Sequence, residues 1–284
     1  MQSPTEDDSP RRPSIGDGIG ALAQRVELPW VPILVTVGFV GFFVGLWVLV
    51  ATLGGSTTIQ PYRLDFSVVT PFIGTFVEGL GYTLQIAVLT IALGMLLGIV
   101  VAAARLSSVS AVRWITTVYV ELMRGTPLLV QLFWVYYALP ILTGIQLPAF
   151  ESVVFALTLN VGAFYGEAFR SGIQAIPREQ VETADVLGLH YVQRMRFVIV
   201  PQAFRIVLPV LISISVSLFK DTSLVSVLGV NELMYTTRTI STDTYRPLEV
   251  YTTAAIIYFI VAFPVTIIMR RYEIYLGRHL AQEK

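Results

Sequence analysis

Cysteine is absent from this chain of 284 residues, and lysine and histidine are nearly absent. Without cysteine the chain can form neither a disulfide nor a thiolate-ligated metal site. The two histidines, His190 and His279, lie far apart in the sequence, which argues against a metal site or histidine-based catalysis. Neither Lys220 nor Lys284 follows a glycine, whereas a phosphate-binding P-loop needs a Gly-Lys-Ser/Thr core. We therefore expect no catalytic centre, bound cofactor or bound metal, and any ATP would be hydrolysed by a partner subunit.

Charged residues are also scarce. They make up 13% of the chain, against 55% hydrophobic residues, whereas soluble domains carry about 25% charged residues. Apolar runs of about 20 residues recur, which is typical of membrane-spanning helices. The short alternating segments of a transmembrane barrel are not seen in the sequence. The composition therefore predicts an all-α, polytopic helical membrane protein, with membrane lipid and no nucleic acid among its partners.

The apolar runs place about six transmembrane helices along the chain. Residues 1–29 are rich in Pro, Ser, Asp, Arg and Gly, which predicts a disordered tail. Residues 30–54 are predicted to form a first membrane-spanning helix rather than a cleaved signal peptide, and residues 54–71 a polar loop. Five further spans are expected, at about residues 72–104, 114–142, 152–172, 206–230 and 248–269.

Basic residues are distributed unequally between the two sides of these spans. With the N-terminus inside, fourteen arginines and lysines fall at the cytoplasmic face and three, Arg63, Arg238 and Arg246, fall outside. Cytoplasmic loops carry an excess of Lys and Arg. Both termini, the tail at 1–29 and the long polar segment after residue 172 are therefore expected in the cytoplasm. The chain is predicted to be a multi-pass protein of the cell (plasma) membrane.

The span at residues 114–142 contains both a break and two opposite charges. Pro127 removes a backbone donor and clashes with the preceding turn, so the span is expected to be kinked or broken there. Glu121 and Arg124 are three residues apart, on one helical face, where they can pair. Two interpretations stay open: the two charges neutralise each other, or they border a translocation pathway for charged or zwitterionic solutes.

Other polar residues also fall within the predicted spans. An ionisable side chain at the centre of a membrane helix costs about 2.5–3.5 kcal/mol, so it normally faces a protein interior or a polar cavity. Glu167, Lys220 and Asp221 are of this kind. Lys220, Asp221, Thr222 and Ser223 point in successive directions around a helix, so not all four can face one cavity. Asn160 and Gln131 are weaker candidates for a functional role, because interhelical hydrogen bonding would explain a polar side chain at each position.

A long polar segment with four arginines follows Pro177. Pro177 suits the first turn of a helix, and Gly188 can either end the helix or permit close backbone approach. A second short helix is expected at residues 192–199, ending before Pro201. The two helices would either insert into a groove of a soluble partner protein or lie on lipid headgroups. The hydrophobic periodicity does not distinguish these two interpretations. Apolar residues at helical spacing along the first helix are Val181, Ala184 and Leu187.

Residue spacing in this segment is distinctive. Glu182-Thr183-Ala184 is followed after three residues by Gly188 and, after nine more, by Val198-Ile199-Val200-Pro201. This resembles the EAA loop of binding-protein-dependent ABC importer permeases, whose pattern is Glu-Ala-Ala, three residues, Gly, nine residues, then Ile-x-Leu-Pro. The departures at Thr183, Val198 and Val200 are conservative in size.

Three more runs are similar to the polar amino acid permeases, the histidine/glutamine/arginine/glutamate group. They are residues 121–131 (ELMRGTPLLVQ), 169–177 (FRSGIQAIP) and 220–227 (KDTSLVSV). The resemblance covers about residues 76–275. It implies a five-helix permease domain at residues 72–275 with a coupling loop at residues 173–205, preceded by one additional transmembrane helix.

The resemblance also implies a function and partners. The chain would be the permease subunit of an ATP-driven importer of polar amino acids, with two ABC ATPase subunits, an extracytoplasmic binding protein and a second permease chain, identical or not. The rival is an ion- or proton-coupled secondary transporter, which predicts inverted repeats with discontinuous helices; one broken segment and no repeat pairing are seen. The residues assigned to ATPase coupling are Glu182, Thr183, Ala184, Gly188 and Pro201. Those assigned to the substrate path are Glu121, Arg124, Asn160, Glu167, Lys220 and Asp221.

Overall fold

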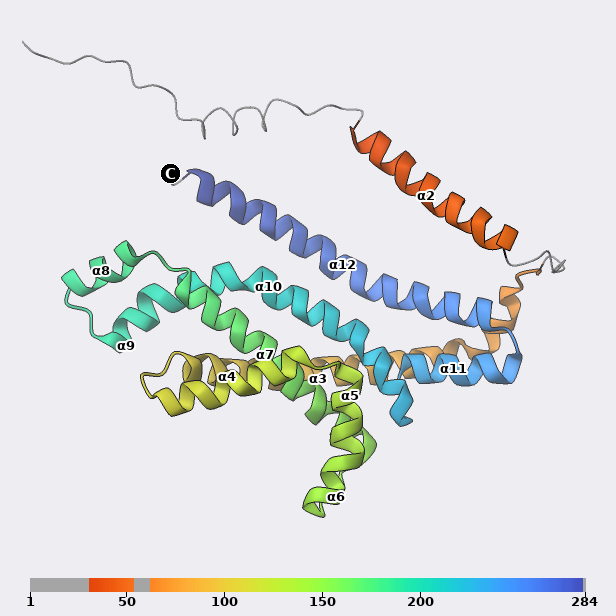
Figure 1. Ribbon diagram of the computed structural model, residues 1–284, viewed down its shortest axis with the longest axis horizontal. Helices are drawn as coiled ribbons and strands as arrows, with labels where there is room; N and C mark the ends of the chain where they lie inside the picture. Colours follow the sequence, from red (N-terminus) through yellow and green to blue (C-terminus); the bar gives the residue numbers. More distant parts are fainter. Residues whose placement is uncertain (1–30, 54–61, 283–284) are drawn as a thin grey trace, which may run out of the picture. The chain divides into compact units, whose positions relative to one another are not determined.

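The computed structural model describes residues 31–53 and 62–282, and it contains helices and no strand in those ranges (Figure 1). The chain divides into two units, one up to Arg63 and one from Leu64 onward. In the first unit, a continuous apolar run forms α2 (Val31–Leu53). The prediction of an all-α chain is confirmed, and the predicted tail at residues 1–29 lies outside the described residues.

The second unit is a bundle in which the longer helices lie alongside one another and short turns join them (Figure 1). Its two 3₁₀ helices are η1 and η4, and its two π-helical turns are η2 and η3. In order, the elements are η1 (Phe66–Phe72), α3 (Ile73–Arg105), α4 (Ser110–Gly125), α5 (Leu128–Phe133), η2 (Trp134–Ala138), α6 (Leu139–Thr143), α7 (Ala149–Gln174), α8 (Arg178–Val186), α9 (Tyr191–Arg194), η3 (Met195–Ile199), α10 (Val200–Asp221), η4 (Thr222–Leu228), α11 (Leu233–Thr244) and α12 (Pro247–Gln282).

Five spans can be recognised in the described residues by length and composition. Four are single helices, and the fifth is a broken pair, Ser110–Gly125 with Leu128–Thr143, bent by 111°. The break predicted at Pro127 is therefore confirmed. Its cause is local: a residue before proline avoids the helical region, and Thr126 is extended at φ −113° and ψ 147°. The sixth predicted span, at residues 30–54, coincides with α2 and stays a prediction. The four single spans are Phe66–Arg105, Ala149–Gln174, Tyr191–Leu228 and Pro247–Met269.

The core of the second unit is the contact between α3 and α7, which glycines make very close. A Cβ built at Gly98 of α3 would lie 2.6 Å from Cβ of Tyr165 and 3.0 Å from the backbone nitrogen of Gly166. A Cβ at Gly166 would lie 2.5 Å from Val101 Cγ1. Small residues are what allow membrane helices to approach this closely. Tyr165 is fully buried, and its hydroxyl lies 2.7 Å from Oγ of Ser215, which ties α7 to α10.

One α-helix of the described residues, α11, was not predicted from the sequence. α11 is too short and too polar to span a membrane, and its threonines and serine are weak helix formers. It is held by the buried carboxylate of Glu232, which accepts hydrogen bonds from two backbone N–H groups of its first turn at 2.9 and 2.7 Å. The Tyr258 hydroxyl donates to the same carboxylate at 3.1 Å. Glu232 therefore fastens α11 to α12.

Two local expectations are wrong. The second short helix does not end before Pro201, because α9, η3, α10 and η4 form one continuous helix from Tyr191 to Leu228. The wider π-turn η3 ends at Ile199, two residues before Pro201, and makes room for the proline ring within the first turn of α10. The segment expected to be a polar loop also contains η1, which Asp65 caps by accepting hydrogen bonds from Ser67. These hydrogen bonds lower the pKa of the Asp65 carboxyl.

The close contact of α3 and α7 can be tested with two glycines of the same helix. Gly98→Ala is expected to lower the free energy of unfolding by about 1–3 kcal/mol, because the added methyl group meets backbone atoms that cannot move aside. Gly81→Ala is the matched control, since no atom lies within 4 Å of a Cβ at Gly81. The stability of both variants is measured by thermal unfolding of the purified protein in detergent. Equal stability of the two variants would contradict the close packing of α3 and α7.

Candidate functional site

The segment between α7 and α10 forms a helical hairpin at one end of the bundle (Figure 1). Pro177 precedes the first turn of α8, as expected, and the helix ends at Val186. Gly188 then adopts a left-handed backbone with φ +71°, a conformation that glycine takes with little strain. Its N–H donates to the Asp185 carbonyl at 2.9 Å, and the N–H of Leu189 donates to the Ala184 carbonyl at 3.1 Å. These bonds close the helix end and turn the chain toward α9.

The five residues predicted for ATPase coupling occupy different places in this hairpin. Ala184 is buried, whereas Glu182 and Thr183 are exposed on α8. Gly188 forms the turn, and Pro201 lies exposed in the first turn of α10. An ion pair between Asp185 and Arg194 links α8 to α9. The structure therefore brings these residues into one hairpin, while their role in coupling stays a prediction.

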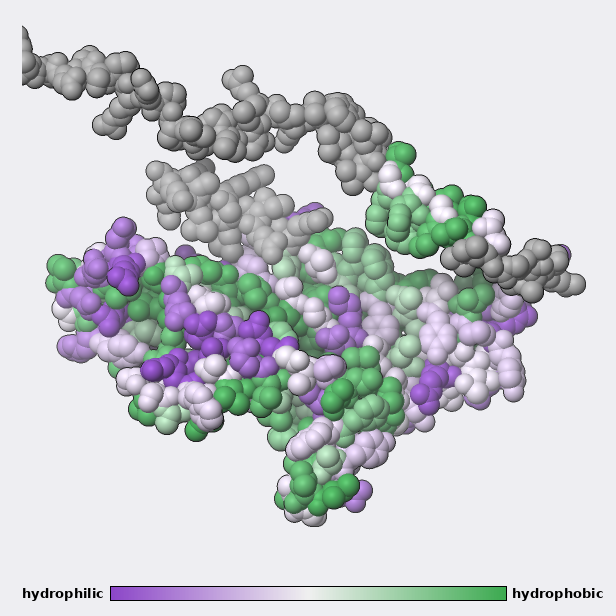
Figure 2. Space-filling model, in the orientation of Figure 1, coloured by the Kyte–Doolittle hydropathy of each residue, from purple (hydrophilic) through white to green (hydrophobic). Residues whose placement is uncertain are grey.

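Large apolar side chains stand exposed at the tip of the hairpin. Val186 is 88% exposed, and Leu187 and Val192 are each 72% exposed. The periodicity of the sequence placed Leu187 on one apolar stripe of α8 with Val181 and Ala184, but the helix ends one residue earlier, so Leu187 leaves that face. Figure 2 shows hydrophobic and hydrophilic residues side by side at this end of the molecule. An exposed apolar tip is typical of a surface that another protein covers.

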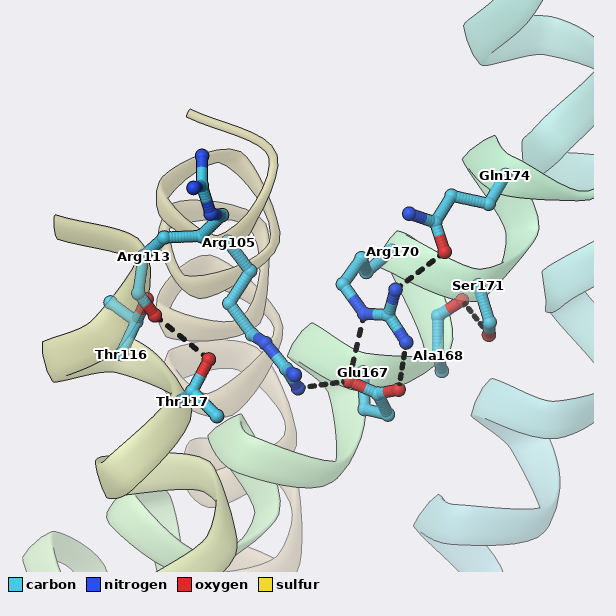
Figure 3. A network of polar contacts seen from close by, with 9 residues as sticks. All are labelled: Arg105, Arg113, Thr116, Thr117, Glu167, Ala168, Arg170, Ser171 and Gln174. Carbon is cyan, nitrogen blue, oxygen red and sulfur yellow. Dashed lines mark hydrogen bonds and ion pairs between the residues drawn. The ribbon is translucent and has the colours of Figure 1, made fainter. Parts of the chain in front are cut away.

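An ion-pair network lies near the same end, between α3 and α7 (Figure 3). Glu167 of α7 forms ion pairs with Arg105 of α3 and with Arg170, whose Nε donates to it at 3.0 Å. Arg170 also donates to Gln174 in the last turn of α7. The two arginines neutralise the carboxylate, so Glu167 is engaged within the chain. The spacing of Glu167 and Arg170, three residues apart on a helix, could have indicated this pair from the sequence.

Asn160 and Gln131 hold the broken span together. Nδ2 of Asn160 donates to the Gln131 side chain at 2.9 Å and to the Met123 carbonyl at 3.2 Å. Nε2 of Gln131 donates to the same Met123 carbonyl at 2.9 Å and to Thr126 Oγ1 at 2.8 Å. These bonds satisfy backbone groups that the break leaves without helical partners. Both side chains therefore serve the interhelical hydrogen bonding that the sequence offered as the alternative to a role in transport.

The remaining candidates for the substrate path are exposed. Glu121 and Arg124 form no ion pair with each other, and the Arg124 guanidinium instead lies over the Phe164 ring at 5.5 Å. Lys220 and Asp221 are exposed at the end of α10, where Ser213 and Ser217 continue the polar stripe of Lys220. A second polar stripe on α4 carries Thr117, Glu121 and Arg124. Figure 2 shows hydrophilic residues over α4 and α7 on the face in view.

The structure thus sorts the six candidate path residues into two groups. Asn160 and Glu167 are engaged in bonds within the chain, whereas the other four face outward from this single chain. Polar stripes along membrane-spanning helices normally face protein or a water-filled cavity rather than lipid. In the described part of the chain no group of three His, Cys, Asp or Glu residues is placed to hold a metal ion.

Comparison with known proteins identifies a family. Residues 94–274 match the family model described as "binding-protein-dependent transport system inner membrane component". The arginine transport system permease protein ArtQ of Bacillus subtilis is 37% identical over 211 residues, covering 74% of this chain and 96% of ArtQ. The glutamine transport system permease protein GlnP of Escherichia coli K12 is 33% identical over 212 residues, covering 74% of this chain and 97% of GlnP.

Solved structures agree with these matches. A crystal structure of an amino acid ABC transporter with histidines contains a chain that is 34% identical, with a TM-score of 0.70 over 75% of this chain and 99% of that one. The MetNI methionine ABC transporter in an inward-facing conformation has a TM-score of 0.57 at 16% identity, which supports the fold. The match to the family model spans the broken helix, the hairpin and most of the bundle, and the chain belongs to the family of binding-protein-dependent transport system inner membrane components.

Proposed function

We propose that this chain is the transmembrane permease subunit of an ATP-driven, binding-protein-dependent ABC importer of polar amino acids. The observation that carries the proposal is the helical hairpin of α8 and α9, which holds the EAA-like residues at one end of a bundle that matches amino acid permeases. The relatives are permease components for arginine and glutamine, which supports a polar amino acid as the solute. No observation favours the ion-coupled alternative.

In this proposal the hairpin docks on a separate ABC ATPase subunit, which binds and hydrolyses the ATP. Exposed Glu182 and Thr183 and the apolar tip at Val186 and Leu187 would enter a cleft on that subunit. Buried Ala184 and left-handed Gly188 would give the hairpin its shape, and Pro201 would join it to the span that follows. The basic residues of this end support a cytoplasmic position, with both chain termini on the same side.

Two permease chains, identical or homologous, would pair over two ATPase subunits and receive solute from an extracytoplasmic binding protein. The polar stripes of α4 and α10 support this pairing, because their exposed charges need a partner chain or an aqueous path within the membrane. We assign contact with the solute to exposed Glu121, Arg124, Lys220 and Asp221. Asn160 and Glu167 would support this path by holding the helices that line it.

The coupling role is tested by two glycines that share one backbone conformation. Gly188→Val is expected to abolish uptake and the stimulation of ATPase activity, because a β-branched residue is strained at φ +71° and distorts the docking hairpin. Gly144→Val is the matched control: Gly144 has φ +73°, also with no atom within 4 Å of an added Cβ, but it lies at the end of α6, outside the hairpin.

Both variants should insert into the membrane in normal amounts, measured by immunoblot of membrane fractions. Solute uptake into cells and ATP hydrolysis by the purified complex are then compared. Normal uptake by the Gly188→Val protein, or equal loss in both variants, would refute a specific coupling role for the hairpin.

The division of the path residues gives a further prediction. Glu121→Gln and Lys220→Gln are expected to raise the KM for uptake or to change the order of preference among amino acids. Thermal stability should be unchanged, because neither side chain forms a hydrogen bond or ion pair with the described residues. Glu167→Gln is expected to lower stability, because it leaves Arg105 and Arg170 without their shared carboxylate. Uptake kinetics and thermal unfolding are measured for all three variants. Unchanged kinetics in both exposed-residue variants would exclude them from the path.

A further inference from the structure

A large apolar cavity of about 870 Å³ lies between α3, α7 and α10. Ile99 and Ala103 of α3, Ile173 of α7, and Phe204 and Leu208 of α10 are among its lining residues. None of the residues assigned to the substrate path lines it. A zwitterionic solute would lose its hydration there without gaining hydrogen-bond partners. The cavity is therefore unsuited to polar solutes and suited to a hydrocarbon chain.

The position of the cavity links it to the hairpin. Tyr191 of α9 and Met195 of η3 line it, and both belong to the segment that leads from the hairpin into α10. Whatever fills the cavity therefore touches the element to which we assign ATPase docking. If the occupant of the cavity changed, the atoms that pack against that element would change too.

One rim of the cavity is polar, and a basic residue outside the lining is hydrogen-bonded to it. Ser107 and Ser108, in the turn between α3 and α4, line this rim. The exposed guanidinium of Arg113 donates to the carbonyl oxygens of these two serines at 2.9 and 3.4 Å, which holds a positive charge beside the opening. Basic pockets between membrane helices on the cytoplasmic side are typical binding sites for anionic lipid headgroups.

We propose that an acyl chain of an anionic phospholipid occupies this cavity, with its phosphate at the Ser107–Ser108 turn and Arg113. The surrounding bilayer supplies the hydrocarbon, and the charge of Arg113 selects an anionic headgroup. The bound lipid supports Tyr191 and Met195 and thereby raises the coupling of ATP hydrolysis to transport. This regulatory part rests on the proposed function, whereas the lipid site itself does not.

The test uses the complete complex of permease and ATPase subunits in nanodiscs of phosphatidylcholine, with or without phosphatidylglycerol. Lipid retained by the complex is measured by native mass spectrometry, and ATP hydrolysis is measured in parallel. The wild-type complex is expected to retain phosphatidylglycerol in preference to phosphatidylcholine and to hydrolyse ATP faster in its presence. Arg113→Gln is expected to reduce that preference about five-fold, the effect of one basic residue near an anionic surface, with activity in phosphatidylcholine retained.

A second variant fills the cavity itself. Ala103→Trp should abolish retention of phosphatidylglycerol and its effect on ATP hydrolysis. Ala111→Trp is the matched control, because Ala111 is exposed on α4 and does not line the cavity. Equal retention of the two lipids by the wild type, or the same retention in the two tryptophan variants, would overturn the proposal. If the wild-type complex hydrolyses no ATP with either lipid composition, the proposed function fails, but the retention experiment still tests the lipid site.

A single introduced cysteine can distinguish a phospholipid from other occupants of the cavity, because the chain has no cysteine of its own that would react. A single cysteine introduced by Ala103→Cys should react with a lipid-soluble maleimide, and phosphatidylglycerol should slow that reaction. Formation of a disulfide between two copies of the variant, or protection by protein in the absence of phosphatidylglycerol, would show that a protein segment fills the cavity. Either result would overturn the lipid assignment.

Discussion

The close approach of α3 and α7 at their glycines is the contact from which the rest of the second unit is built. In a bilayer, lipid tails are as apolar as leucine side chains, so helices associate through van der Waals packing and hydrogen bonds rather than through the hydrophobic effect. Gly98 and Gly166 bring the two backbones together where a Cβ would collide. Buried Tyr165 then extends the contact to α10 through Ser215, and the ion pairs of Glu167 close one end of it.

The polar groups in this bundle fall into two classes: those that form hydrogen bonds or ion pairs within the chain, and those that do not. Asn160 and Gln131 donate hydrogen bonds to a backbone carbonyl at the broken span. Arg105 and Arg170 form ion pairs with Glu167. Other polar groups, on the stripes of α4 and α10, remain exposed in the single chain. Because unsatisfied charge within a membrane is costly, the exposed stripes support the proposal of a second chain and an aqueous path. The satisfied groups instead tie the helices of this chain to one another.

The continuity of the helix from Tyr191 to Leu228 gives the hairpin a direct mechanical connection to the membrane. A displacement of α9 moves α10 with it, since no flexible loop separates them. The π-turn before Pro201 preserves this continuity where a proline would otherwise disrupt the helix. The apolar cavity lies beside this junction, because Tyr191 and Met195 are among its lining residues.

The sequence by itself determined the membrane-protein class, the break at Pro127 and the spacing of the EAA-like residues, because these follow from local composition and from proline and glycine chemistry. It did not disclose α11, whose helix depends on a buried carboxylate capping its first turn, or the continuation of the helix through Pro201. The spacing of Glu167 and Arg170 could have indicated their ion pair, but spacing alone could not separate the engaged residues from the exposed ones. Glu121 and Arg124 are also three residues apart on a helix and form no ion pair with each other. Only the tertiary structure decided that division, because the partners that satisfy Asn160 and Glu167 come in part from segments distant in the sequence.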